Sequence, residues 1–173
     1  AVYAGSPRYS LRARNNEFAK LDVLEQGIKE AHERNKKFFL TVNTLPHNSK
    51  LKTFVADMEP LIAMKPDALI MADPGLIMTV REKWPEMPIH LSVQANTTNY
   101  WGVKFWQNIG VERIILSREL SMEEIAEIRQ ECPDIELEVF IHGALCIAYS
   151  GRCLLSGYFN HRDPNQGTCT NSC

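Results

Sequence analysis

Apolar and polar positions along this chain change between a strand-like and a helix-like pattern. Short runs of β-branched, aromatic and aliphatic residues predict strands at 2–5, 37–44, 68–72, 89–94, 113–117 and 136–142. Apolar residues three or four positions apart predict helices at 21–34, 50–64, 75–84, 99–109 and 121–132. Ser121 followed by Glu124 has the spacing of a capping box, which supports the start of the last of these helices.

The alternation of strands with helices is typical of an all-parallel α/β protein. An open doubly wound sheet and a parallel (β/α) TIM-like barrel both fit it, but the Gly-x-Gly-x-x-Gly fingerprint of dinucleotide binding is absent. The six predicted strands and an apolar strand at the very first residues favour a barrel that is incomplete in this chain, with its first strand and its C-terminal part missing. We therefore expect a partial barrel at 1–143 and a cysteine-rich, cluster-binding segment at 144–173, packed on the barrel mouth. An open barrel edge is a template for another strand, so self-association is expected there.

The charge balance excludes a strongly basic nucleic-acid-binding domain. Nineteen Lys and Arg residues against 21 Asp and Glu residues give a net charge of -2, so any contact with RNA requires a local basic patch. The apolar runs are too short to span a membrane, and the first residues lack the pattern of a signal peptide. These features together predict a cytoplasmic protein without membrane contact.

Polar residues follow the predicted strands at their carboxyl ends, where (β/α) barrels carry their functional groups. These residues are Asn43, Asp73, Gln94, Arg118 and His142. One hypothesis is a catalytic ring of donors and acceptors around a polar ligand, in which Arg118 binds a small carboxylate through its bidentate fork. The alternative is that the Asn and Asp side chains cap helices and brace turns, while Arg118 pairs with Glu119.

Four of the five cysteines fall in a Gly-rich segment at the end of the chain, whereas Cys132 stands apart. The four are Cys146, Cys153, Cys169 and Cys173. Disulfides are disfavoured by the lack of an export signal. Structural zinc prefers two closely spaced cysteine pairs, of which only Cys169 and Cys173 resemble one. Looser spacing suits an iron–sulfur cluster. The spacing therefore favours a cluster over zinc, with unligated thiols as a third alternative.

Longer motifs around these cysteines resemble the collagenase-like peptidase family. The resemblance rests on the segments 142–146, 150–158 and 162–169, and it extends through 3–5, 12–18, 73–75, 92–96 and 116–120, so it covers essentially the whole chain. Members of this family begin with one more strand and continue into further domains, which agrees with an incomplete barrel.

The resemblance implies a tRNA-modifying enzyme that carries out prephenate-dependent 5-hydroxylation of a wobble uridine with a [4Fe–4S] cluster. By position, Cys146, Cys153 and Cys169 match cluster ligands, and Cys173 is the local candidate for the fourth. A patch at the barrel mouth would bind the phosphates of tRNA through Arg8, Arg12, Arg14, Arg152 and Arg162.

Two alternatives remain open. One is a collagenase-like peptidase, although the sequence has neither the His-Glu-x-x-His nor the Gly-x-Ser-x-Gly motif. The other is a cluster-binding or zinc-binding scaffold without catalysis.

Overall fold

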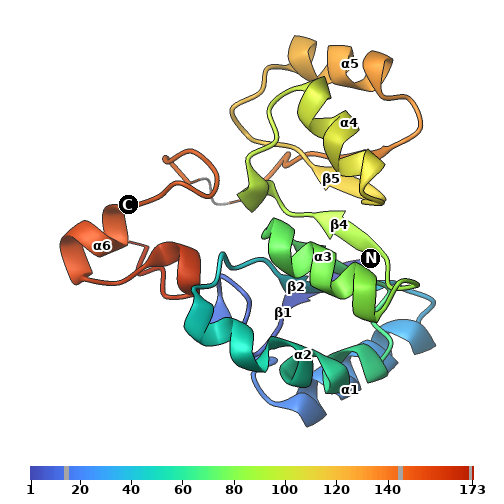
Figure 1. The fold of residues 1–173 in the computed structure, drawn as a ribbon, viewed down its shortest axis with the longest axis vertical. Helices are drawn as coiled ribbons and strands as arrows, with labels where there is room; N and C mark the ends of the chain where they lie inside the picture. The colour runs from blue at the N-terminus through green and yellow to red at the C-terminus, as the bar shows by residue number, and fades with distance from the viewer. Residues whose placement is uncertain (14–15, 144–145, 172) are drawn as a thin grey trace.

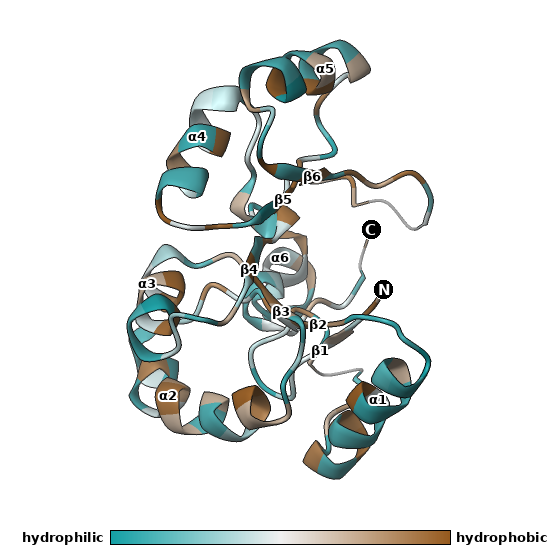
Figure 2. Cartoon of the chain, turned by 90° about the vertical axis from the view of Figure 1, so that its right-hand side faces the viewer, coloured by the Kyte–Doolittle hydropathy of each residue, from teal (hydrophilic) through white to brown (hydrophobic). Residues whose placement is uncertain are grey.

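The strands form one parallel sheet whose spatial order is the order of the chain. The computed structural model describes residues 1–13, 16–143, 146–171 and 173. Its strands are β1 (Val2–Gly5), β2 (Phe38–Val42), β3 (Ala68–Met71), β4 (Ile89–Leu91), β5 (Arg113–Ile115) and β6 (Glu136–Glu138), paired in the order β1-β2-β3-β4-β5-β6. Figure 1 shows the fold, and all six strands are labelled in Figure 2. A doubly wound sheet would reverse its strand order at a switch point. The winding is therefore that of a (β/α) barrel, as predicted, and in the described residues β1 and β6 are its unclosed edges.

A helix follows each of the first five strands. These helices are α1 (Leu21–Glu33), α2 (Asn48–Ala63), α3 (Pro74–Lys83), α4 (Tyr100–Asn108) and α5 (Met122–Glu131). The main core lies between helices and strands, where Leu24 and Ile28 of α1 pack in one cluster with Leu40 of β2. In Figure 2 the central strands are mostly hydrophobic, while the surrounding helices carry both kinds of residue. The predicted capping box is present at the start of α5.

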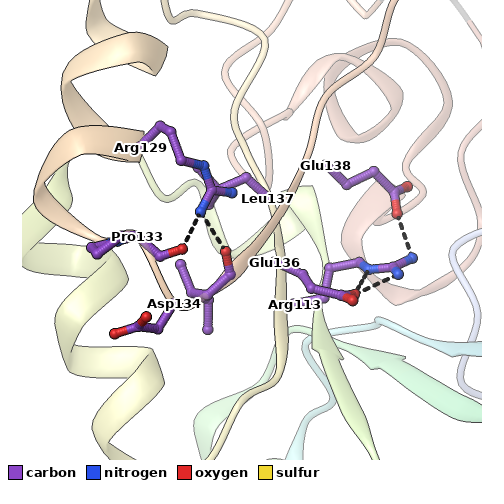
Figure 3. A pocket seen from close by; sticks show the side chains of 8 residues that line it. Arg113, Arg129, Pro133, Asp134, Glu136, Leu137 and Glu138 are labelled. Carbon is purple, nitrogen blue, oxygen red and sulfur yellow. Dashed lines mark hydrogen bonds and ion pairs between the residues drawn. The ribbon is translucent and has the colours of Figure 1, made fainter.

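The opposite face of the sheet carries a smaller apolar cluster and a charged network. The strand register places His90 of β4 beside Arg113 of β5, and Arg113 beside Glu136 of β6. Arg113 donates from Nε to the Glu136 carboxylate over 2.8 Å and from Nη1 to Glu138 over 3.2 Å (Figure 3). Its guanidinium also stacks 5.3 Å from the Phe39 ring. Burial and the nearby charge of Arg113 lower the pKa of His90 to about 4, so His90 is neutral at pH 7.

Four strand predictions extend at least two residues too far at their carboxyl ends, and the excess is largest for two of them. The strand predicted at 89–94 stops at Leu91, because the Ser92 hydroxyl accepts the Gln94 amide and starts the 3₁₀ helix η2 (Val93–Ala95). The strand predicted at 136–142 stops at Glu138, because β6 is an edge strand and has a partner on one side only. The loops at the carboxyl ends of the sheet therefore begin earlier than the hydrophobic pattern indicates.

The C-terminal segment adds a short helix, α6 (Leu155–Asn160), and the 3₁₀ helix η3 (Pro164–Gln166). Figure 1 shows α6 on a side of the molecule away from α4 and α5. Among the described helices, none combines the length and the apolar character that crossing a bilayer requires.

Candidate functional site

The four C-terminal cysteines line one small cavity at the carboxyl ends of the strands. The cavity has a volume of about 100 Å³, and it is also lined by Arg12, Gln94 and Arg118 from the loops after β1, β4 and β5. All four thiols are free; those of Cys153 and Cys169 are half-buried, whereas those of Cys146 and Cys173 are exposed. The tail thus brings soft sulfur donors together with polar and cationic groups of the barrel.

Cys132 lies elsewhere, at the end of α5, and its thiol donates to the Tyr100 carbonyl oxygen over 3.8 Å. Burial raises the pKa of this thiol, which keeps it protonated and unreactive at pH 7. The structure therefore separates one structural thiol from the four at the cavity.

Asn165 fixes the tail to the barrel mouth. Its side-chain oxygen accepts a hydrogen bond from the side-chain Nε2 of Gln94 over 3.0 Å, and its side-chain nitrogen donates to the Cys153 carbonyl oxygen over 3.2 Å. Its own carbonyl accepts the Leu45 N–H over 3.2 Å, and the neighbouring Gln166 bonds the Leu45 carbonyl in return. One residue therefore links the loop after β2, the loop after β4 and the Cys153 segment.

Two glycines allow the close contact between tail and barrel. Gly151 has φ +75°, and a Cβ there would lie less than 3.0 Å from the Gln94 backbone oxygen. Gly167 has φ +90°, and a Cβ there would lie 2.7 Å from the Ser10 carbonyl oxygen. Any other residue at these positions would adopt a disfavoured left-handed conformation, and its Cβ would collide with a backbone oxygen of the barrel. Only glycine therefore permits the docked tail.

Arg118 lies between the cysteine cavity and a second cavity of about 370 Å³. Its guanidinium stacks 5.6 Å from the Phe140 ring and donates to the Ser150 hydroxyl over 3.4 Å. Most of the second cavity is apolar; its walls include Leu116, Leu120, Met122, Ile125, Phe140 and His142. Arg118 is half-buried and makes no ion pair with any described residue, which leaves its positive charge available to an anion.

Glu119 does not pair with Arg118, although the sequence allowed it. Its carboxylate instead accepts the Ser150 N–H over 2.9 Å and the Asn96 side chain over 3.4 Å. This carboxylate therefore ties the cysteine segment to the loops after β4 and β5, a role that the sequence analysis missed.

The predicted ring of five polar side chains is only partly a common site. Gln94 and Arg118 line the cysteine cavity, and His142 joins Arg118 at the second cavity. Asn43 accepts the Leu11 N–H over 3.1 Å and donates to Ser92. Asp73 caps α3 by accepting the Leu76 N–H over 2.9 Å. Neither lines the two cavities; both make local structural hydrogen bonds, and the catalytic role predicted for Asn43 and Asp73 stays a prediction.

The five predicted RNA-binding arginines have different surroundings. Arg8 pairs with Asp57 over 2.7 Å against α2, away from the cysteine cavity. Burial acts to raise the pKa of Asp57, but hydrogen bonds from Tyr9 and Thr53 and the Arg8 charge hold it below its ordinary value. Arg12 lines the cysteine cavity, Arg152 and Arg162 are exposed on the tail, and Arg14 lies outside the described residues.

Sequence reasoning also missed Asn165, whose side chain and carbonyl bond the loops after β4 and β2. The only local signal is the turn-forming run Asp163-Pro164-Asn165-Gln166-Gly167, in which Asp163 caps η3. Such a run predicts a turn but not its partner, because Gln94 lies 71 residues away along the chain.

A broad surface pocket of about 500 Å³ at the amino ends of β5 and β6 is not a comparable candidate (Figure 3). Its arginines are already engaged, Arg113 by two glutamates and Arg129 by the carbonyls of Pro133 and Ile135. Functional groups in barrels of this class lie at the other end of the strands.

The fold and the cavity together define a parallel α/β protein of the (β/α)-barrel class with a cysteine-lined site at the carboxyl ends of its strands. The profile of "Peptidase family U32" matches residues 1–173, and the chain belongs to this family. The family resemblance read from the sequence motifs is thereby confirmed.

Curated relatives share high identity with the chain. It is 69% identical over 173 residues to "tRNA hydroxylation protein P" of Escherichia coli (strain K12), covering 100% of this chain and 38% of that protein. It is 70% identical to the protein of the same name from Haemophilus influenzae, covering 100% of this chain and 37% of the relative. The chain thus spans less than half the length of these relatives.

The solved structure of the U32 peptidase Mk0906 has a TM-score of 0.62 and 14% sequence identity, covering 79% of this chain and 58% of that chain. At this identity the likeness concerns the fold alone, and it supports the barrel-type architecture.

Proposed function

We propose that this chain belongs to an RNA-modifying enzyme that hydroxylates a uridine of tRNA at carbon 5, with a [4Fe–4S] cluster and prephenate as co-substrate. The observation that carries the proposal is the cavity that four free cysteines and Arg118 line together. The printed names of the E. coli and H. influenzae relatives, tRNA hydroxylation protein P, support the tRNA part.

The donor chemistry of the cavity fits a cluster, because thiolates are the ligands that iron–sulfur clusters take. Among residues 1–13, 16–143, 146–171 and 173, no group of three or more His, Cys, Asp or Glu side chains is arranged to hold a metal ion as it stands. Binding would therefore draw Cys146, Cys153, Cys169 and Cys173 closer together, and the metal–thiolate bonds would supply the energy for this step. A bound cluster supplies one-electron redox chemistry.

Arg118 and the second cavity fit a small cyclic acid. A guanidinium that is free of ion pairs can bind a carboxylate through two parallel hydrogen bonds. The Phe140 ring and the aliphatic walls would cover the apolar ring of such an acid, while His142 could exchange a proton with it. Because Arg118 lines both cavities, the acid would be held beside the cysteines.

The direct test is anaerobic incubation of the protein with unmodified tRNA, prephenate and an electron-accepting dye, which takes up the two electrons released when a C–H bond becomes C–OH, followed by mass spectrometry of the nucleosides. We expect 5-hydroxyuridine from the wild type. Arg118→Lys should raise the KM for prephenate about tenfold or more, since a bidentate charged contact contributes about 1.5–3 kcal/mol. Arg8→Lys is the matched control, because Arg8 is engaged with Asp57 outside both cavities.

Equal KM values for the two variants would refute the role of Arg118. Hydrolysis of a collagen-derived peptide without any change in tRNA would favour the peptidase alternative instead.

A further inference from the structure

Helix α6 exposes two neighbouring aromatic side chains. Tyr158 is 80% exposed and Phe159 is 60% exposed, and their rings meet edge to face with centroids 5.1 Å apart. Aromatic residues normally bury such area, so an exposed pair of this kind marks a contact surface. The pair stands close to the cysteine cavity in the chain, since Cys153 and Leu155 line that cavity before it and Asn165 and Cys169 line it after.

The electrostatic surroundings of this pair suit an anion. Of the 21 Asp and Glu residues in the chain, only Asp163 lies beyond residue 138, and its carboxylate is occupied in capping η3. Arg152 and Arg162 flank α6 and are exposed. Neither guanidinium makes a hydrogen bond or an ion pair within the described part of the chain, in contrast to Arg8 and Arg113. Along the chain, the aromatic pair therefore lies between two exposed arginines that no described carboxylate neutralises.

We propose that Tyr158 and Phe159 form a stacking surface for an unpaired base of the RNA substrate, with Arg152 and Arg162 binding the adjoining phosphates. This inference rests on the proposed function and identifies the part of the chain that holds the RNA. A base can be modified at a cavity only if it leaves its stack, and aromatic rings replace the lost stacking in a sequence-tolerant way. Unpaired cations next to exposed rings are the combination that single-stranded nucleic acid requires.

The test compares the binding of two fluorescently labelled RNAs by anisotropy: a hairpin with an unpaired loop and a fully paired duplex of the same length. The double variant Tyr158→Leu/Phe159→Leu should bind the hairpin roughly 5- to 100-fold more weakly, while its affinity for the duplex stays close to that of the wild type. Arg162→Gln should weaken binding of both RNAs and lower the slope of log affinity against log salt by about 1.

The matched control is Trp101→Leu/Phe105→Leu. These aromatic residues of α4 are 70% and 55% exposed, but they lie beside Lys104, which pairs with Glu131, and away from α6. This variant should bind both RNAs like the wild type. Thermal unfolding followed by circular dichroism checks that all variants are folded. We expect them to be, because the substituted side chains are exposed.

Four outcomes overturn the inference. If the wild type binds the hairpin but the α6 variant binds it equally well, stacking is refuted while the proposed function stands. If the α6 variant loses affinity for the hairpin and the duplex equally, the aromatic pair contacts the RNA backbone and not a base. If it loses only self-association, measured by sedimentation, the pair contacts another protein chain. If the wild type binds neither RNA, both the inference and the tRNA part of the proposed function fail.

Discussion

Replacing Gly151 with alanine should release the tail from the barrel mouth without unfolding the barrel. Gly151 combines φ +75° with an approach to the Gln94 carbonyl oxygen that leaves no room for a Cβ. A left-handed conformation costs a non-glycine residue about 1–2 kcal/mol. Relieving the collision requires the tail to move away from Gln94, which breaks the Gln94–Asn165 hydrogen bond and removes about 0.5–1.5 kcal/mol more.

The total penalty of about 1.5–3.5 kcal/mol falls on a segment that few hydrogen bonds hold to the barrel. Cys153 lies two residues beyond Gly151, so the half-buried thiol should become accessible. Hydrogen exchange measured by mass spectrometry should show loss of protection at 150–170 and unchanged protection in β2 and β3. Labelling of Cys153 by a thiol reagent should accelerate in parallel.

Gly110→Ala is the matched control, because Gly110 has φ +84° but a Cβ there would meet only the Arg81 side chain, at 3.4 Å. This substitution should cost the free energy of a left-handed alanine at the turn between α4 and β5, and it should leave the tail protected from hydrogen exchange. Equal protection of the tail in the wild type and in Gly151→Ala would refute the reasoning, since the collision with Gln94 would then be avoided without undocking.

Two further predictions concern the stability of the barrel. The pKa of His90 is about 4 in the folded protein against 6.5 in the unfolded chain. The contribution of neutral His90 to the free energy of unfolding is therefore complete above pH 6.5 and is lost as the pH falls towards 4. Urea unfolding should show about 2 kcal/mol less stability at pH 5 than at pH 7, and His90→Gln should remove most of this difference; an unchanged difference would contradict a neutral buried His90. Ser121→Ala removes the capping box of α5 and should reduce the free energy of unfolding by about 1 kcal/mol, whereas Ser49→Ala, in the first turn of α2 where no side-chain cap is present, should change it little.

The regular elements could be predicted from the sequence because each depends on a local pattern. The spacing of Leu21, Leu24, Ile28 and Ala31 predicts the buried face of α1; the last three are buried, whereas Leu21, the first residue of the helix, is exposed. The Ser121–Glu124 spacing likewise predicts the start of α5. The strands β4 and β6 were predicted too long at their carboxyl ends. The Ser92 side chain ends β4 by starting a 3₁₀ helix, and β6 has a partner strand on one side only.

The site could be predicted only in its chemistry. The four cysteines and Arg118 were identified by residue type, yet what holds them near one another is Asn165, Glu119 and Gly151, which act through partners far away in the chain. Asp73 followed by Pro74 is a local helix-cap signal, and the Asp73 side chain does cap α3. The Arg8–Asp57 pair joins residues that no local pattern connects.

The most direct test of the account is the iron and acid-labile sulfide content of anaerobically purified protein, measured together with its absorption spectrum. The account predicts about four iron and four sulfide per chain in the wild type and in Cys132→Ser, and loss of both in Cys153→Ser and Cys169→Ser. Stoichiometric zinc, or iron that persists in Cys153→Ser, would contradict a [4Fe–4S] cluster at this cavity.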